Sequence, residues 1–333
     1  TIHSLLCNSG NANSCTGKQG EEDTRTTAEI VASGLHIPSD QVLTASTGII
    51  GKRLPVKKIQ DSFDELKENL SDSGNRSFAE AIMTTDTTRK ETSLSLTLSS
   101  GVCTVGGCAK GAGMIHPDMA TMLAFITTDA KIQPDRLTTI LTMAANNTFN
   151  NLTVDGDTST NDMALLLANG ASGVKAKTEE DYRLLYKGIE SVCSSLCKAI
   201  AADGEGATKS IEIHVRGGDK REDCIRVAKA VAGSNLVKTA VFGCDPNWGR
   251  IISAAGYSKA LFKVEDLCVY LCGVPVFKNG TPADFNQEAL SHLMKENNEI
   301  PIDISIGDGE YTASAHTCDL TYDYIKINAE YHT

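Results

Sequence analysis

The spacing of apolar and polar residues predicts neighbouring β-strands in the first half of the chain. ETSLSLTLSS, residues 91–100, alternates polar and apolar positions, as a strand does when only one of its faces is buried. VCTVGGCAKGAG (102–113) and TMLAFITTD (121–129) have the composition of its neighbours. Because the three segments follow one another closely, they predict an antiparallel meander rather than a crossover connection.

Apolar residues at helical spacing predict helices around these strands. Pro134 suits the first turn of one helix, and Thr178 suits the N-cap of the longest, which ends near Gly204. Helices are expected over residues 24–35, 56–70, 134–149, 178–204, 221–232 and 284–296, with a short one running from Phe78 into a threonine-rich turn.

The other periodic segments complete a mixed α/β chain of the α+β type. NDMALLLAN, residues 161–169, is interpreted as a helix capped by the polar turn DGDTSTND. Since strands are often adjacent in sequence, we expect mainly antiparallel sheets covered by helices, not a doubly wound parallel sheet. The further strands are expected at residues 41–47, 210–217, 265–273, 300–307 and 322–331.

Charge and length narrow the classes of partner. The 333 residues include 31 basic and 42 acidic side chains, a formal net charge of −11, which argues against nucleic-acid or anionic-membrane binding. No run approaches the ~20 apolar residues that a membrane helix needs. We therefore expect a small-molecule partner and a cytoplasmic location.

Eleven cysteines are interpreted as mostly reduced and buried, because their number is odd and no secretory signal precedes them. The pairs Cys193/Cys197 and Cys268/Cys272 do not have zinc-ribbon spacing. No metal and no resident cofactor are expected.

Two polar motifs fail as nucleotide or calcium sites. In GGCAKGAG, Lys110 precedes Gly111 and Ala112, whereas a P-loop lysine follows glycine and precedes Ser or Thr. DGDTSTND lacks the mid-loop glycine and the final glutamate of a calcium loop. His116 is a candidate base or an ordinary loop histidine.

The junction Ala120–Thr121 has two interpretations. Inside an intact chain, Thr121 is a β-branched strand residue whose hydroxyl is a weak nucleophile without a local base. If the preceding peptide bond is cut, the new α-amine, with a pKa near ~8, can accept the hydroxyl proton. One residue would then supply both nucleophile and base.

Five motifs bring a family resemblance: KGAGMIHPDMATMLAFITTDA, TVDGDTSTNDM, GEGATK, GCDPNWGRI and INAEYHT. In this order, and over essentially the whole chain, they resemble the ornithine acetyltransferase family of arginine biosynthesis. The resemblance implies self-cleavage into an α chain of residues 1–120 and a β chain of residues 121–333. It also implies an αββα sandwich similar to amino-terminal nucleophile enzymes. Since members carry several dozen more residues at the start, we expect an amino-terminal segment to be missing here.

The resemblance also implies a reaction. Thr121 is expected to attack the acetyl group of N-acetylornithine, and glutamate then accepts the acetyl group in a ping-pong transfer. Thr47 and Gly48, in STGIIG, match the oxyanion segment. Without the resemblance they read as a turn that ends a strand.

The substrate-binding residues follow from the same match. Lys110 is expected to hold a substrate carboxylate, and Glu205 to pair with an amino group or shuttle a proton. Thr87 matches a binding threonine, although Thr84, Thr85 and Thr88 leave that register open. Asn328 and Thr333 match contacts made by the C-terminus.

Several alternatives stay open at this point. The same nucleophile could pass its acyl group to water, as an amidase or aminopeptidase does, or the chain could be a catalytically silent binding protein. Acetyl-CoA is open as a co-substrate. The family implies an assembly of two α and two β chains, and a mitochondrial matrix location is the alternative to the cytoplasm.

Overall fold

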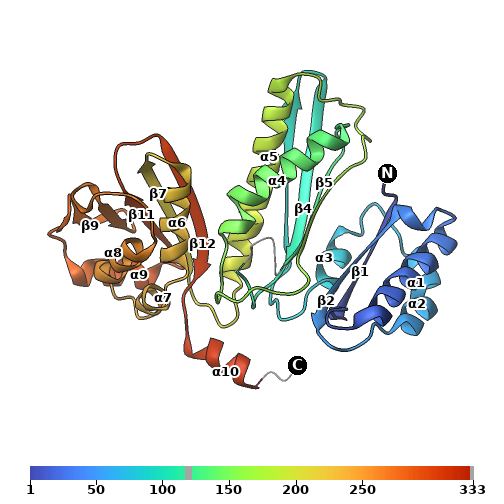
Figure 1. Cartoon of the computed structure of the whole chain (residues 1–333), viewed down its shortest axis with the longest axis horizontal. Coiled ribbons are helices and arrows are strands. Elements are labelled where there is room, and N and C mark those ends of the chain that lie inside the picture. The colour runs from blue at the N-terminus through green and yellow to red at the C-terminus, as the bar shows by residue number, and fades with distance from the viewer. Residues whose placement is uncertain (117–121, 331–333) are drawn as a thin grey trace.

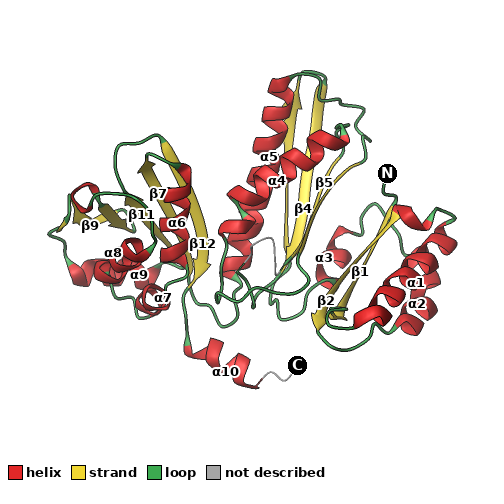
Figure 2. Ribbon diagram, in the orientation of Figure 1, coloured by secondary structure: helices red, strands yellow, loops and turns green. Residues whose placement is uncertain are grey.

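The computed structural model describes residues 1–116 and 122–330 (Figures 1 and 2). In chain order its helices and strands are β1 (Ser4–Asn11), α1 (Gly17–Leu35), β2 (Val42–Ile49), α2 (Val56–Glu68), α3 (Asn75–Ala81), β3 (Lys90–Leu98), β4 (Gly101–Lys110), β5 (Leu123–Thr128), α4 (Pro134–Asn147), β6 (Met163–Ala168), α5 (Glu179–Ala202), β7 (Ser210–Gly218), α6 (Arg221–Ala232), α7 (Asn235–Phe242), α8 (Trp248–Tyr257), β8 (Cys268–Leu271), β9 (Val274–Lys278), β10 (Thr281–Pro282), α9 (Gln287–Glu296), β11 (Glu299–Ser305), β12 (Tyr311–Cys318) and α10 (Tyr322–Glu330). Short 3₁₀ helices lie at Ser39–Gln41, Phe149–Asn151 and Val264–Asp266.

Four layers confirm the expected αββα sandwich. Helices α1 and α2 pack on one face of the β1–β2 sheet, where Val31, Val42 and Phe63 are buried together. The other face of that sheet packs against the β3–β6 sheet through a cluster that includes Ala45 and Phe125. Helices α4 and α5 cover the far face of the second sheet. Each of these two sheets therefore packs against helices on one face and against the other sheet on its other face.

The four-stranded β3–β6 sheet brings the end of β4 and the starts of β5 and β6 side by side. Strands β3, β4 and β5 form the predicted antiparallel meander, and β6 adds to β5 in parallel. Lys110 at the end of β4 lies opposite Leu123 at the start of β5, and Leu123 lies beside Met163 at the start of β6. The β4–β5 connection therefore begins and ends at the same end of the two paired strands.

Helix α5 confirms the long amphipathic helix. Thr178 and Asp181 form a capping box at its start, with the Asp181 amide donating to Thr178 Oγ1 at 3.1 Å. Its apolar stripe is buried against the β3–β6 sheet, and each such side chain contributes roughly 1.5–3 kcal/mol by leaving water. The buried residues of this stripe are Leu185, Ile189, Val192, Leu196 and Ile200.

A six-stranded sheet forms a second lobe, at the left of Figure 1. Its strand order is β10-β9-β8-β11-β7-β12, and helices α6 to α9 surround its own apolar cluster. Along β7, residues Ile211, Ile213 and Val215 alternate into that cluster. Helix α5 contacts β7 and β12 as well as β3 and β4, so it joins the two lobes.

Antiparallel pairing predominates, as expected, among the described residues. Six strand pairs are antiparallel, and three are parallel: β1–β2, β5–β6 and β7–β11. The parallel pairs involve strands separated by helices or long loops, because a parallel partner needs a crossover connection.

The helix expected at residues 161–169 is wrong, because this segment contains strand β6. The run MALLLA is continuously apolar and too short for its periodicity to separate a buried strand from a helix. Its pairing with β5, from Leu123↔Met163 to Thr128↔Ala168, decides in favour of the strand.

The strand expected at residues 322–331 is also wrong, because residues 322–330 form helix α10. Tyrosine and isoleucine favoured a strand, but that propensity is weak and depends on a partner strand. Here Thr321 begins the helix by accepting a hydrogen bond from the Tyr324 amide at 3.2 Å. Helix α1 likewise begins at Gly17, earlier than the expected residue 24.

The described helices give no candidate for a membrane span, since none combines enough length with enough apolar character.

Candidate active site

Lys110 places a buried cation at the end of β4. Its side chain is only 7% exposed, and its Nζ donates hydrogen bonds to Thr84 Oγ1 at 2.7 Å and to Thr47 Oγ1 at 3.3 Å. Burial lowers the pKa of Lys110, although the nearby Asp86 carboxylate opposes that shift. The ammonium is therefore held by neutral hydroxyls, which leaves its charge available to an anionic ligand.

Strand β2 brings Thr47 and Gly48 to this lysine. The pairing of β2 with β1 puts Thr47 opposite Ser9 and Gly48 opposite Gly10. Gly48 has φ +129°, and a Cβ built on it would lie 2.3 Å from the Gly10 carbonyl carbon. Only glycine fits here, because a side chain would collide with the β1 backbone.

A buried ion-pair network supports the loop before β3. Lys90 Nζ lies 2.7 Å from Asp86 Oδ1 and 2.5 Å from Asp203 Oδ2, and all three residues are at most 9% exposed. Asp86 also accepts the Gly111 amide at 2.6 Å and the Thr84 amide at 3.1 Å. Burial would raise the pKa of Asp86, but the Lys90 charge and the Gly111 amide outweigh burial and lower that pKa. Asp86 thus fixes residues on both sides of the Lys110–Thr84 contact.

The threonines of residues 84–88 have different partners. Thr84 meets Lys110, whereas the hydroxyl of Thr87 donates to Asp203 Oδ1 and its amide donates to Asp203 Oδ2 at 3.0 Å. Thr88 also donates its amide to Asp203, at 3.3 Å. The structure therefore brings Thr84, rather than Thr87, into contact with the candidate lysine.

Glu205 and Asn328 come together across a long sequence separation. Asn328 Nδ2 donates to Glu205 Oε2 at 2.9 Å, so helix α10 is joined to the loop after α5. The Glu205 amide donates to the Ala112 carbonyl at 2.8 Å, and the Glu205 carboxylate lies against Gly113. The loop that follows Lys110 thus connects the Lys110 site to the Glu205–Asn328 pair.

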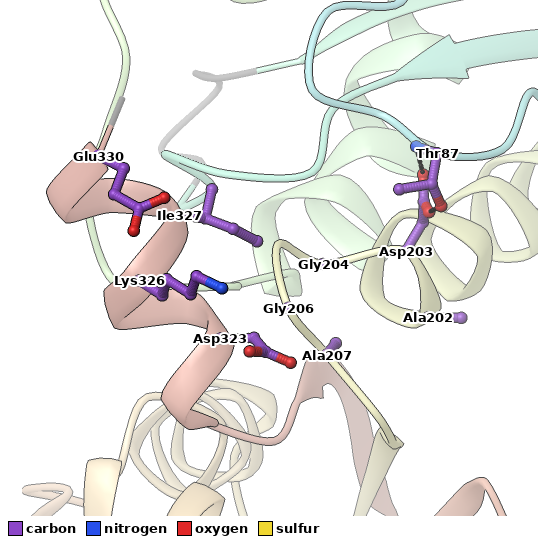
Figure 3. Close-up of a pocket in the computed structure, with 10 residues that line it drawn as sticks. All are labelled: Thr87, Ala202, Asp203, Gly204, Gly206, Ala207, Asp323, Lys326, Ile327 and Glu330. Atoms are coloured by element: carbon purple, nitrogen blue, oxygen red, sulfur yellow. Dashed lines mark hydrogen bonds between the residues drawn. The ribbon is translucent and has the colours of Figure 1, made fainter. Parts of the chain in front are cut away.

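A pocket of about 410 Å³ lies between α10 and the loop after α5. Figure 3 shows Thr87 and Asp203 directed toward each other on one side, and Lys326 and Ile327 of α10 on the other. Its volume is in the range of small-ligand sites. Among the predicted site residues that the structure describes, Thr87 lines it and Lys110 does not.

The polar turn DGDTSTND anchors its neighbours through Asp155. Asp155 accepts the amides of Met114 at 2.7 Å and Ile115 at 2.9 Å, and the Tyr324 hydroxyl at 3.2 Å. It therefore ties the β4–β5 connection to α10. His116 Nδ1 and Thr153 Oγ1 are hydrogen bonded at 3.0 Å, so this ring has a polar partner.

Asp162 is a residue of this region that the sequence did not single out. It ends the polar turn and precedes Met163, the first residue of β6. The Met122 amide donates to its carboxyl group, and Lys110 lies near enough for its charge to act on Asp162. Its Oδ2 is shielded from solvent and has no hydrogen-bond partner in the described structure. Burial raises the pKa of Asp162 to about 8, although the Lys110 charge and the Met122 amide oppose that rise. The available signal was an acid at the boundary between a polar turn and an apolar run.

The cysteines behave as expected, since all eleven are unpaired and six are buried. Burial raises the pKa of Cys193 to about 12 and that of Cys197 well above its usual range. In the part of the chain that the structure describes, no group of three or more His, Cys, Asp or Glu side chains is arranged to hold a metal ion. The predicted cleavage residues Ala120 and Thr121, and the terminal Thr333, lie outside the described residues.

Comparison with known proteins finds similarity over the whole chain. A family model described as the ArgJ family matches residues 1–333. The arginine biosynthesis bifunctional protein ArgJ of Bacillus subtilis is 47% identical over 335 residues, covering 100% of this chain and 82% of that protein. The protein of the same name from Staphylococcus aureus is 45% identical over 337 residues, covering 100% and 80%. A crystal structure of the ArgJ protein from Bacillus halodurans is 43% identical with a TM-score of 0.61, and covers 63% of this chain and 100% of that one.

Proposed function

The chain belongs to the ArgJ family, and from that premise we propose that it is an acetyltransferase of arginine biosynthesis that moves acetyl from N-acetylornithine to glutamate. The curated relatives carry the name of a bifunctional arginine biosynthesis protein, and they align with this chain from end to end. The fold supports the same conclusion, because its αββα layers are those of amino-terminal nucleophile enzymes.

One observation carries the proposal: Lys110, on β4, lies opposite Leu123, on β5, and its ammonium contacts Thr47. Thr121 is two residues before Leu123 in the sequence. The register therefore supports a site to which the β3–β6 sheet contributes the nucleophile and a carboxylate-binding cation, while strand β2 of the facing sheet contributes the oxyanion segment.

The chemistry is acyl transfer through an ester. The Thr121 oxygen attacks the acetyl carbonyl of N-acetylornithine, the C–N bond breaks, and ornithine leaves while acetyl stays on Thr121. The amino group of glutamate then attacks this ester and releases the threonine. The α-amine of Thr121 accepts the hydroxyl proton in the first half and returns it in the second.

Thr47 and Gly48 are the proposed oxyanion donors. Negative charge develops on the former carbonyl oxygen, and donors that are already oriented stabilise it most. Lys110 donates to Thr47 Oγ1, so the hydroxyl proton of Thr47 is directed to another acceptor. The fixed backbone at Gly48 favours one orientation of its amide.

Lys110 is proposed to hold the substrate carboxylate, with Glu205 and Asn328 at the other end of the ligand. A buried ammonium flanked by two threonine hydroxyls suits a carboxylate. Glu205 offers an anionic group to an amine, and Asn328 orients that group. Thr87 and Thr333 remain proposed substrate contacts, Thr87 through the pocket that it lines.

Maturation is part of the proposal, with cleavage between Ala120 and Thr121 into chains of residues 1–120 and 121–333. Denaturing electrophoresis of the purified protein tests it. Two fragments whose second begins with Thr121 are expected, whereas a single band at the full 35.4 kDa would argue against a matured enzyme.

Transfer itself is tested by incubating the protein with N-acetylornithine, with and without glutamate. We expect ornithine and N-acetylglutamate in equal amounts only when glutamate is present. Ornithine release at the same rate without glutamate would indicate an amidase that passes the acyl group to water.

Three finer points extend the proposal. Acetyl-CoA serves as a second acetyl donor, which free-thiol release in the presence of glutamate would test, and no resident cofactor is required. Two α and two β chains assemble, which size measurement in solution would test. The enzyme works in the cytoplasm, with the mitochondrial matrix as the alternative compartment.

A further inference from the structure

Asp162 occupies a defined place at the edge of the β3–β6 sheet. Leu123 and Met163 are paired across β5 and β6, and the Met163 amide donates to the Met122 carbonyl at 2.8 Å. Asp162 precedes Met163, and its carboxyl group accepts the Met122 amide. Since Met122 is bonded to Thr121, this carboxyl group is held one residue from the proposed nucleophile.

Only one of the two carboxyl oxygens of Asp162 accepts a hydrogen bond within the described structure. Oδ2 is out of contact with solvent and has no hydrogen-bond partner there, the one such side-chain oxygen or nitrogen found among the described residues. Buried polar atoms nearly always have a partner, so an exception calls for an explanation. A ligand that brings its own donor or acceptor to Oδ2 supplies that partner.

The surroundings of Asp162 keep a proton on it near neutral pH. Burial raises its pKa to about 8, even though the Lys110 charge and the Met122 amide both lower it. Lys110 is in turn surrounded by Asp86, Lys90 and Cys7, which are the other titratable groups of this region. A carboxyl group that titrates close to the working pH can both donate and accept a proton.

We propose that Asp162 is a catalytic residue that exchanges a proton with the substrate amino group in both halves of the acetyl transfer. This inference rests on the proposed function. In the first half, the Asp162 O–H gives its proton to the nitrogen of N-acetylornithine as the C–N bond breaks, so ornithine leaves as a neutral amine. In the second half, the Asp162 carboxylate takes a proton from the neutral amino group of glutamate as the new amide forms.

The proton count balances over the cycle. The α-amine of Thr121 holds the hydroxyl proton while the acetyl ester exists and returns it when the ester is broken. Asp162 loses one proton in the first half and regains one in the second. No further reactant is needed.

Glu205 fits this role less well. Its carboxylate accepts the Asn328 amide at 2.9 Å and lies on a half-exposed loop. A solvated carboxylate whose oxygen already has a donor is suited to binding an amine. Glu205 therefore keeps the binding role, and the proton exchange belongs to Asp162.

The purely structural alternative is that Asp162 only anchors Met122. Asp162→Asn separates the two roles, because the amide oxygen of asparagine can still accept the Met122 N–H while its NH₂ group cannot exchange a proton at neutral pH. Asp181→Asn is the matched control, since Asp181 is a buried acid that accepts backbone amides at the start of α5.

The experiment compares two acetyl donors in the first turnover. N-acetylornithine needs a proton on its leaving nitrogen, whereas 4-nitrophenyl acetate releases a stable phenolate that needs none. Rapid-quench measurement of ornithine and of nitrophenolate gives both rates. For Asp162→Asn we expect ornithine release to fall about 100-fold or more, as for loss of a general acid, and nitrophenolate release to fall less than about 10-fold. Asp181→Asn should affect both donors alike.

An equal loss with both donors, or no loss with either, would overturn the proposal. If the Asp162→Asn variant is not cleaved into two chains, the pH dependence of the first turnover in the wild-type enzyme tests the proposal instead. Its ornithine release in the first turnover should fall as pH rises through about 8, because the protonated acid is consumed, while nitrophenolate release should not. The same pH dependence for both donors contradicts the proposal.

The two hypotheses fail differently. If the wild-type protein forms no acetyl-enzyme with either donor, the proposed function is wrong. If wild type transfers acetyl to glutamate but the two donors respond alike to Asp162→Asn, only the role of Asp162 is wrong.

Discussion

Lys110 and Leu123 lie directly opposite each other in the antiparallel pairing of β4 and β5. A lysine at this position is buried because the β1–β2 sheet packs over the same face, and Thr47 of β2 contacts its ammonium. The two sheets of the sandwich thus each contribute one half of a polar site, and the substitutions below separate their contributions.

Replacing the buried ammonium should weaken use of the substrate. For Lys110→Met we expect kcat/KM for N-acetylornithine to fall about 30-fold or more, since losing one partner of a buried charge pair costs about 2–5 kcal/mol. Steady-state ornithine release measures it. Lys187→Met, on the exposed face of α5, is the control and should change little. Unchanged kinetics in Lys110→Met would remove this lysine from the site.

Two matched substitutions, Thr84→Val and Thr87→Val, can decide which threonine of residues 84–88 matters more for the substrate. Thr84→Val removes a hydrogen bond to a charged group, worth about 1.5–3 kcal/mol, so we expect kcat/KM to fall about 10-fold or more. Thr87→Val removes a donor to Asp203, so it should lower the midpoint of thermal unfolding and cause a smaller kinetic loss than Thr84→Val. A larger kinetic loss in Thr87→Val than in Thr84→Val would make Thr87 the more important of the two substrate contacts.

The tight contact between β1 and β2 predicts intolerance at Gly48. Gly48→Ala places a Cβ 2.3 Å from the Gly10 carbonyl carbon, and Gly51→Ala at φ +75° meets nothing within 4 Å. Backbone strain alone costs about 1–3 kcal/mol, so both variants should unfold at lower denaturant concentration. Gly48→Ala should lose more stability and should also lose acetyl transfer. Equal effects of the two substitutions would contradict a steric requirement at Gly48.

His316 predicts a loss of stability in mild acid. Burial lowers the pKa of His316 to about 4, although the neighbouring Glu212 opposes the shift. The unfolded chain therefore binds the proton more readily, and stability falls as pH decreases from about 6.5 to about 4, by about 3 kcal/mol in full.

Thermal unfolding across that pH range measures the His316 effect. His316→Gln should flatten the dependence, and His292→Gln, whose side chain is 71% exposed, should not. A dependence that is the same in wild type and His316→Gln would exclude this histidine as the source.

Local patterns were sufficient where a segment carries its own signal. The meander β3–β5 was predicted because alternation extends over enough residues to distinguish a strand, and α5 was predicted because its cap and its apolar stripe agree. The site residues named from motifs include Lys110, which the structure places beside Thr47.

Tertiary contacts were decisive where local signals are short or evenly balanced. The run MALLLA became strand β6 because β5 offered it a partner, whereas α10 became a helix that begins where Thr321 accepts the Tyr324 amide. Both segments are compatible with either structure until a neighbour provides or withholds hydrogen bonds.

The sequence by itself determined which chemical groups are present, the boundaries of the strongly periodic elements and the family of the chain. Only the tertiary structure decided that Thr84 rather than Thr87 meets Lys110, and that a buried oxygen of Asp162, beside Met122, has no partner among the described residues. The reason is physical: hydrogen bonds, burial and pKa shifts depend on distances between groups far apart in sequence, and those distances exist only once the sheets have packed.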